Sequence, residues 1–365
     1  MARRLATVFV LVVAVALAGA AVAAPAALGP PDGETATTAY PAVTADLGVA
    51  TGAGDAGLRA AFDQAALEHR LANASASARE DELEAHLGTL EEELEELDAR
   101  EQAAIEDEVD VRELLRVHAR AEARLGTLPD LREHLATGSA DDPAQHPAAL
   151  EGRYRLHTGP VRAAMLGAIR GEGRLDPRLD RHASGYTLSA THGGGYLREA
   201  VRFDRWSANG TEDAAAAIQR VAEAYPETTG TTAAVHLGDG RYLVERTAPT
   251  GTVAGYVAGE EGTIAAERQR HRVERLSVET EVDTTEDGLV VGVRGYGEER
   301  PLRITVERAS DGAPVDARVF LRYDTTWTAV GTTGSEGRHW SVTPPGSFAV
   351  RVVGPEGGIA TVEVG

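Results

Sequence analysis

The chain has 365 residues, of which 42% are hydrophobic and only 5% aromatic, so its cores are expected to consist mainly of Val, Leu, Ala and Ile. It carries 57 Asp and Glu residues against 36 basic residues, a formal net charge of −21, and every basic residue is Arg. The complete lack of Cys excludes disulfides, thiolate nucleophiles and Cys-based metal sites. The complete lack of Lys excludes a Walker lysine, a kinase lysine and a pyridoxal Schiff base.

The charge balance predicts a protein adapted to high salt. At 1 M salt the Debye length is about 3 Å, so charge repulsion is screened and excess surface carboxylate is needed to hold water and keep the protein soluble. GC-rich codon usage also replaces Lys by Arg, but it does not explain the acidity. An acid-rich, Lys-free composition resembles that of haloarchaeal proteins. The same acidity argues against nucleic acid as a partner, because phosphates are bound by clustered Lys and Arg.

Residues 1–24 are typical of an export signal or an N-terminal anchor. Arg3 and Arg4 precede an apolar run that starts at Leu5, and an Ala-x-Ala cleavage motif ends at Ala23. The apolar run is also long enough to span a bilayer if it is retained. Since the arginines stay inside, both alternatives place residues 25–365 outside the cytoplasmic membrane, in an extracellular or cell-surface location. Export by the Sec route and by the twin-arginine route both remain open.

The next two segments are a flexible linker over residues 25–57 and a helical region over residues 58–138. A short helix is expected over Leu58–Leu71, and a second periodic stretch follows Val111. Between them, leucines recur with the heptad spacing of a coiled-coil seam: Leu83, Leu87, Leu90, Leu94 and Leu97. One interpretation is a self-contained helical hairpin, and the other is an intermolecular coiled coil through which the chain would self-associate.

Residues 139–150 form a second, Pro-containing linker, and residues 151–274 are expected to form a small α+β domain. The elements expected there are helices over Pro160–Arg170 and Asp213–Tyr225 and strand pairs over Gly185–Phe203, Ala233–Arg246 and Thr252–Ala266. Residues 275–365 show many short strands separated by turns, which is typical of an antiparallel β-sandwich. The predicted fold class is therefore multidomain α+β, with a helical hairpin or coiled coil, a small α+β domain and a C-terminal sandwich.

Two short motifs suggest chemistry but are better explained as turns. His192-Gly193-Gly194-Gly195 matches the oxyanion loop of lipases, but the nucleophile elbow that this loop requires is missing from the sequence. Asp283, Thr285 and Asp287 partly follow a calcium loop, but Arg294 stands where a bidentate Glu is needed. The 11 His residues show no zinc-ligand spacing. We therefore expect no catalytic residue, no metal and no cofactor.

Two sequons could accept N-linked glycans. Asn73 begins the triplet Asn-Ala-Ser and Asn209 begins the triplet Asn-Gly-Thr. Exported proteins can carry glycans at such sites, although a chain of this length often contains one or two sequons by chance.

Resemblances to known families agree with this division. The run that includes Gly312, Pro314 and Val315, followed by Pro345 and Gly346, resembles carboxypeptidase-regulatory-like and related Ig-like modules. That resemblance implies a non-catalytic stalk or adhesion domain. The overall architecture resembles haloarchaeal exported proteins of unknown function. Residues 212–266 are weakly similar to a PepSY unit, which implies a helix packed on a small antiparallel sheet and a role in binding or inhibiting peptidases.

The sequence therefore favours a non-enzymatic exported protein of the cell envelope that acts as a structural or interaction module in high salt. Its helical hairpin would be a projecting arm and its sandwich a spacer. The expected partner is an unknown envelope or extracellular protein. The alternative is a peptidase-regulating or peptide-binding protein that works through residues 212–266.

Overall fold

The computed structural model describes most of the chain after residue 36. The described residues are 37–39, 41, 43, 46–106, 109–135, 147–173, 175–206, 213–226, 228–258, 263–323 and 325–365. The expected signal segment, its cleavage site at Ala23 and the sequon at Asn209 lie outside these residues. Within the described part, no helix is both long and apolar enough to cross a membrane.

Three long helices form the N-terminal part of the fold: α1 (Leu47–Asn73), α2 (Ala76–Ala103) and α3 (Val111–Leu135). Helix α1 begins eleven residues earlier than expected, inside the predicted linker 25–57. The side chain of Asp46 caps it by accepting a hydrogen bond from the amide of Val49 at 3.1 Å. Its first turns contain four glycines, which lower helix propensity and hide the helix from a sequence-based prediction. Buried Val49 and Ala53 anchor these turns through tertiary packing.

The heptad leucines of α2 pack inside the chain. Leu87, Leu90, Leu94 and Leu97 are at most 5% exposed. They belong to one apolar core with Leu67 and Leu71 of α1, with α3, and with Leu150 and Tyr154 of helix α4 (Pro147–Leu156). The seam thus joins helices of one molecule, so a coiled coil between molecules through these leucines would require this core to open. The start of α4 also shows that the last four residues of the predicted linker 139–150 are helical.

The middle of the chain forms one antiparallel sheet of eight strands in the order β1-β2-β3-β4-β8-β7-β6-β5. Its strands are β1 (Thr37–Ala39), β2 (Arg178–His182), β3 (Gly185–His192), β4 (Gly195–Arg202), β5 (Thr231–Gly238), β6 (Arg241–Ala248), β7 (Gly251–Ala258) and β8 (Thr263–Arg272). The pairing of β4 with β8 joins the group β1–β4 to the group β5–β8, with Ala200 opposite Glu267. The edge strand β1 and its neighbour β2 were missed by the sequence analysis because neither is alternately apolar.

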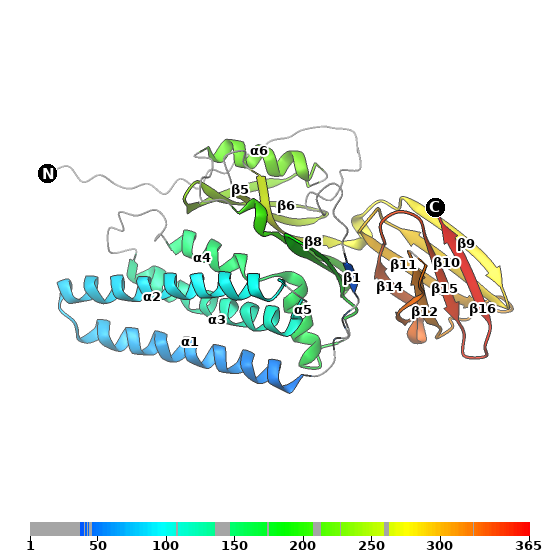
Figure 1. Ribbon diagram of the computed structural model, residues 1–365, viewed down its shortest axis with the longest axis horizontal. Coiled ribbons are helices and arrows are strands. Elements are labelled where there is room, and N and C mark those ends of the chain that lie inside the picture. The colour runs from blue at the N-terminus through cyan, green and yellow to red at the C-terminus, as the bar shows by residue number, and fades with distance from the viewer. Residues whose placement is uncertain are drawn as a thin grey trace.

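Helices cover both faces of this sheet (Figure 1). Helices α3, α4 and α5 (Pro160–Ile169) lie on one face, where Leu114, Met165 and Leu188 share a core. Helix α6 (Ala214–Ala224) packs on the other face, where Val221 meets Val244 and Val253. The helical region is therefore packed along the sheet, and the expectation that it projects as a free arm is wrong. The 3-10 turns η2 (Phe203–Arg205) and η3 (Val273–Arg275) follow β4 and β8.

The C-terminal part is a β-sandwich of two four-stranded sheets, in the orders β14-β11-β10-β9 and β13-β12-β15-β16. Its elements are β9 (Thr280–Glu286), β10 (Leu289–Gly295), β11 (Pro301–Arg308), β12 (Arg318–Arg322), β13 (Thr328–Thr332), η4 (Gly334–Glu336), β14 (Arg338–Val342), β15 (Phe348–Val353) and β16 (Ile359–Val364). The inward-facing residues of β10, Leu289, Val291 and Val293, are buried between the sheets. The predicted multidomain α+β fold with a C-terminal antiparallel sandwich is confirmed.

Polar contacts attach the sandwich to the eight-stranded sheet. The Tyr196 hydroxyl donates to the Glu299 carbonyl at 2.5 Å, and Arg198 Nη1 lies 3.1 Å from Glu299 Oε2. At the edge of the sheet, Arg178 Nη1 donates to the carbonyl of Thr343 at 2.8 Å. Because Arg198 and Arg178 are each only 2% exposed, these contacts seal the junction from water.

Candidate functional site

The two motifs that suggested chemistry are hairpin turns, as expected. Gly193 and Gly194 adopt positive φ of 57° and 75° between β3 and β4. Asp287 and Gly288 do the same, at 47° and 76°, between β9 and β10. Both turns match the left-handed conformations that tight hairpins require. Among the described residues, no group of three or more His, Asp or Glu side chains is placed to hold a metal ion.

Asn73, the sequon inside the described part, ends helix α1. It is exposed, and its side-chain amide donates to the carbonyl of His69 at 2.7 Å. A modifying enzyme can reach this position because it is exposed. Glycosylation at Asn73 stays a prediction.

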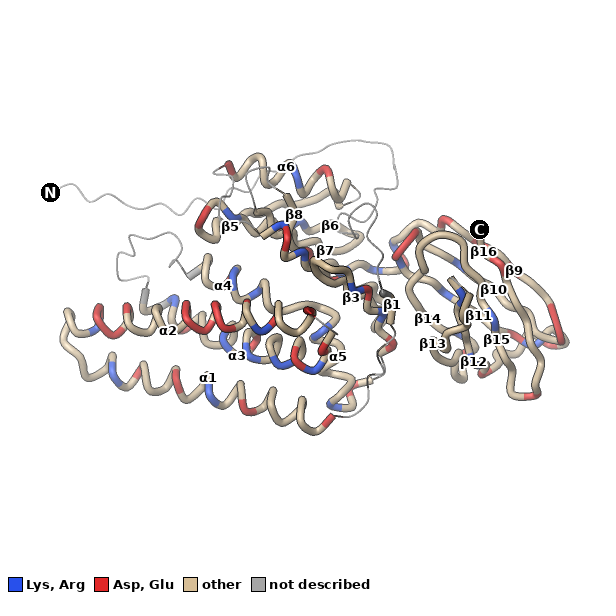
Figure 2. The backbone as a smooth tube through the Cα atoms, viewed as in Figure 1, with Lys and Arg blue, Asp and Glu red and all other residues tan. Residues whose placement is uncertain are grey.

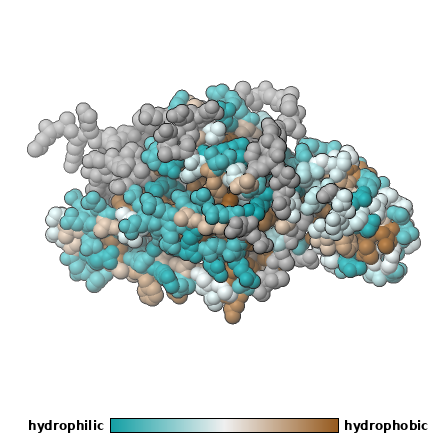
Figure 3. Space-filling view, viewed as in Figure 1, coloured by the Kyte–Doolittle hydropathy of each residue, from teal (hydrophilic) through white to brown (hydrophobic). Residues whose placement is uncertain are grey.

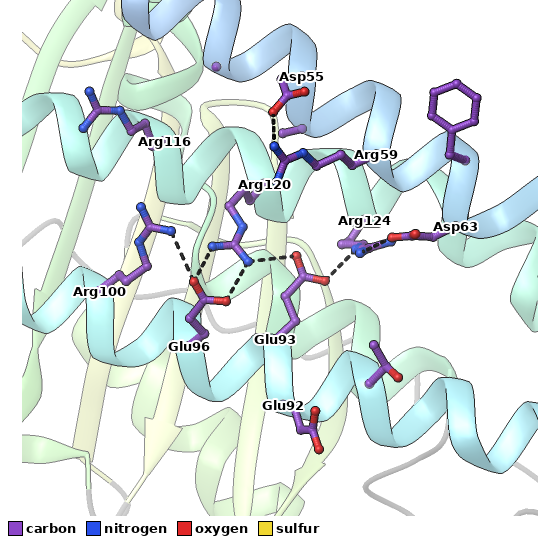
Figure 4. A pocket seen from close by; sticks show the side chains of 14 residues that line it. Asp55, Arg59, Asp63, Glu92, Glu93, Glu96, Arg100, Arg116, Arg120 and Arg124 are labelled. Carbon is purple, nitrogen blue, oxygen red and sulfur yellow. Dashed lines mark hydrogen bonds and ion pairs between the residues drawn. The ribbon is translucent and has the colours of Figure 1, made fainter.

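A charged groove in the helical part is the candidate binding site. Helices α1 and α2 flank α3, whose arginines point between them (Figure 4). The groove has a volume of about 720 Å³. Its charged lining consists of five arginines and five carboxylates: Arg59, Arg100, Arg116, Arg120, Arg124, Asp55, Asp63, Glu92, Glu93 and Glu96. In a chain of net charge −21, this lining is formally neutral.

Helical spacing explains how these charges meet. Arg116, Arg120 and Arg124 are four residues apart, so they follow one face of α3. Glu93 and Glu96 are three residues apart on the facing side of α2. The Arg120 guanidinium binds both oxygens of Glu96 at 2.8 Å. Such a bidentate ion pair is more rigid and stronger than a single hydrogen bond.

Arg124 extends this pairing to all three helices. It donates to Glu93 of α2 at 2.6 Å through Nε and to Asp63 of α1 at 2.7 Å through Nη2. Arg116 is freer, because its ion pair is with Glu113 of its own helix at 3.0 Å. Arg120 and Arg124 are thus held by carboxylates of neighbouring helices, whereas Arg116 presents an accessible guanidinium.

The ion pair between Arg120 and Glu96 stays charged at every ordinary pH. The hydrogen bonds from Arg120 lower the pKa of Glu96 to about 2. The same contact with Glu96 raises the pKa of Arg120. General acids and bases work best when their pKa lies near the working pH, and these shifts lead away from neutrality. The Arg120–Glu96 pair is therefore unsuited to proton transfer, and its charges are available to hold a polar or charged partner.

A second set of charges is buried between the helices and the sheet. Arg162 of α5 is fully buried and joins two carboxylates: its Nη1 donates to Glu101 at 2.8 Å and its Nε donates to Glu199 at 2.9 Å. Glu101 also accepts from the Tyr186 hydroxyl at 2.6 Å, and the ring of His157 lies 2.8 Å from its other oxygen. We call these five residues the buried charge network.

The charges of the network are paired, and this pairing sets the protonation of its members. Burial alone would raise the pKa of Glu101, but the charge of Arg162 and the hydrogen bonds from His157 and Tyr186 hold that pKa well below its usual range. Burial also raises the pKa of Tyr186 well above its usual value. Glu101 stays ionised and Tyr186 stays protonated, so the network fixes the helices on the sheet.

Sequence reasoning missed both sets of charges. The signals for the network were single charged residues inside apolar runs: Arg162 within an otherwise apolar helix, and Glu199 within a strand buried on both faces. For the groove the signal was the four-residue spacing of the α3 arginines. Neither signal predicts which carboxylate pairs with which arginine, because the paired residues lie far apart in the sequence.

The fold and the sites define a multidomain α+β protein with an Ig-like C-terminal module. Comparison with protein families supports this class: residues 280–361 match the archaeal fibronectin-III type-like domain. Residues 22–174 match a domain of unknown function, DUF7096, and residues 178–277 match a family of unknown function, DUF7094. The boundary between the first and second matched regions lies between α5 and β2. The boundary between the second and third matched regions lies between η3 and β9. No curated protein matches the chain.

Proposed function

We propose that this chain is a non-enzymatic, exported protein of the cell envelope that acts as a structural or interaction module in high salt. The observation that carries the proposal is the groove between α1 and α2. Most of its charges are paired across the helices, and in the Arg120–Glu96 pair the pKa of each group is shifted away from neutrality. The groove would hold a partner protein, and the fibronectin-III-like sandwich would act as a spacer.

The sequence supports the location and the solvent in this proposal. The basic and apolar start of the chain, residues 1–24, has the pattern of a segment that is exported or anchors the chain in the membrane. The excess of carboxylates and the lack of Lys suit a protein that meets molar salt.

Protease shaving of intact cells tests the location. A tagged chain expressed in a halophilic archaeon should be degraded by external protease at native salt, while a cytoplasmic marker in the same cells stays intact. A chain protected until the cells are lysed would contradict the export proposal.

Cross-linking in intact cells at native salt tests the interaction. We expect the groove to cross-link to another envelope protein and Arg116→Glu to abolish the cross-link. Arg308→Glu is the matched control, since Arg308 of the sandwich is similarly exposed and also pairs with a carboxylate three residues away at 3.0 Å. Equal cross-linking by the two variants would show that the groove does not bind the partner.

The alternative is a peptidase-regulating or peptide-binding protein. The observation that favours it is the packing of α6 on strands β5–β8, a helix on an antiparallel sheet as a PepSY unit has. This proposal requires the purified chain to inhibit an exported peptidase from the same cells. Unchanged hydrolysis of a peptide substrate at saturating concentrations of the chain would exclude it.

A further inference from the structure

The outer face of α1 carries a stripe without acidic or Arg side chains that no other described segment covers. The described residues contain five exposed large apolar side chains, and three of them lie on α1: Leu47, Leu58 and Phe62, with 80%, 62% and 72% of their surface exposed. At 100° per residue they fall on one side of the helix. Figure 3 shows apolar side chains along α1 at the lower edge of the molecule.

The stripe continues along most of the helix at spacings of three and four residues. It consists of seven exposed residues, none of them Asp, Glu or Arg: Leu47, Thr51, Gly54, Leu58, Phe62, Ala65 and His69. They cover an arc of about 80° on the helix surface. We call this set the α1 stripe. Steps of three and four residues keep one face of a helix in line, as in the heptad seam of α2, but the residues of the α1 stripe face solvent.

The charge of α1 also distinguishes it from its neighbour. Helix α2 contains eleven acidic and two basic residues, a net charge of −9, whereas α1 contains three acidic and two basic residues, a net charge of −1. Figure 2 shows the contrast between the banded red of α2 and the mostly tan α1. Two copies of a chain with net charge −21 repel each other least where their surfaces are neutral.

One glycine of α1, Gly54, lies within the stripe. A Cβ added there would meet no atom of the described part of the chain within 4 Å. Glycine destabilises a helix interior relative to alanine, so packing among the described residues gives no reason for glycine at this position. The missing side chain leaves a hollow between larger neighbours in the α1 stripe.

The stripe is symmetric about Leu58, and that symmetry fits a second copy in antiparallel orientation. Its residues lie 11, 7 and 4 positions before Leu58 and 4, 7 and 11 positions after it. Two copies crossing at Leu58 would therefore place Phe62 of each copy over Gly54 of the other, a large side chain against a hollow. The antiparallel arrangement also aligns the helix dipoles favourably and closes as a two-fold dimer.

We propose that the chain forms an antiparallel homodimer through the α1 stripe, with Leu58 at the two-fold axis and Phe62 seated over Gly54 of the second copy. This inference does not depend on the proposed cellular location, and the stripe adjoins the groove at Phe62, which lines both. The seam of α2, which the sequence suggested for self-association, stays inside each copy.

Sedimentation velocity of the purified chain in molar NaCl tests the dimer. The wild type should sediment as a dimer at micromolar concentrations, and Leu58→Glu should weaken association at least about 100-fold, because it removes apolar burial from both copies and adds a charge at the axis. Ile359→Glu, at an exposed apolar residue of the sandwich, should leave the dimer intact. A monomeric wild type, or a dimeric Leu58→Glu variant, would overturn the proposal.

Two glycine variants test the register. Gly54→Ala and Gly52→Ala should raise the thermal midpoint of the chain alike, because both improve helix propensity. Gly54→Ala alone should weaken the dimer, by about tenfold, since Gly52 lies about 120° around the helix from Leu58. Equal dimerisation by the two variants would overturn the placement of Phe62 over Gly54.

Engineered cysteines test the orientation, and the lack of native Cys keeps the experiment clean. Mixed under oxidising conditions, a Leu47→Cys chain and a His69→Cys chain should form the mixed disulfide, because these positions are equidistant from Leu58. Homodisulfides of Leu47→Cys as the main product would show a parallel pair and overturn the antiparallel arrangement.

Discussion

Replacing Arg162 with methionine leaves Glu101 and Glu199 buried without the guanidinium that joins them. Glu101 is 3% exposed and Glu199 is fully buried, so neither carboxylate can recover the lost contact from water. Removing one partner of a buried pair typically costs about 3–5 kcal/mol. We expect this loss for Arg162→Met, a large fraction of the roughly 5–15 kcal/mol that stabilises an ordinary domain.

The loss is measured by urea unfolding in molar salt at neutral pH. Trp206 packs against the core shared by the helices and the sheet, whereas Trp327 and Trp340 belong to the sandwich. A background with the two sandwich tryptophans changed to phenylalanine therefore reports unfolding of the helix–sheet part by fluorescence. The free energy of unfolding follows from the midpoint and the slope of the transition.

A neutral triple variant separates charge from packing. When Arg162→Met is combined with Glu101→Gln and Glu199→Gln, no unpaired charge remains, so most of the lost stability should return. The exposed pair Arg70–Glu82 between α1 and α2, at 2.7 Å, is the control, and breaking it with Arg70→Met should cost at most about 1 kcal/mol. A cost for Arg162→Met no larger than that of this control would refute the assignment of the network as a stabilising element.

Three further predictions concern pH, salt and backbone conformation. The pKa of Glu96 is lowered from 4.5 to about 2. The stability that its ion pairs contribute is therefore present above pH 4.5 and is lost as the pH falls towards 2. Glu96→Gln should flatten the dependence of the urea midpoint on pH over that window. Dilution from molar salt to tens of millimolar should unfold the chain because carboxylate repulsion is no longer screened, and an unchanged circular dichroism spectrum would contradict salt adaptation. Gly337→Ala should lower the free energy of unfolding of the sandwich by about 1–3 kcal/mol or more, because its φ is 62° and a Cβ would lie 2.6 Å from the Val306 carbonyl oxygen. Gly334→Ala, at φ 61° with open space around it, should cost only about 1 kcal/mol, and equal losses would exclude the steric explanation.

The sandwich could be predicted from sequence because its signals are local. In β10 the alternation of Leu289, Val291 and Val293 with more exposed residues already names the buried face. Asp287-Gly288 marks the turn before β10. These signals need no knowledge of a distant segment, since strand alternation and turn conformation are properties of neighbouring residues.

The beginning of α1 and the edge strand β1 could not be predicted in the same way. The glycines of α1 weaken its local helix signal, and the helix is completed by burial of Val49 and Ala53 against α3 and α5. Strand β1 has three residues and exists through its pairing with β2, where Thr38 stands opposite Asp180. In both elements tertiary contacts outweigh weak local preference.

The sequence by itself excluded the sites and enzymes that require Cys or Lys. It also determined the heptad seam of α2 and the division of the chain into a helical region, an α+β region and a sandwich. Whether that seam joins two helices of one chain or two chains was a matter of tertiary structure, because a heptad describes one helix face and does not name what covers it. The buried charge network was likewise decided by the fold: Arg162 meets carboxylates 61 and 37 residues away in the sequence. Pairing over such distances depends on how helices and strands pack, and that same packing leaves the outer face of α1 uncovered.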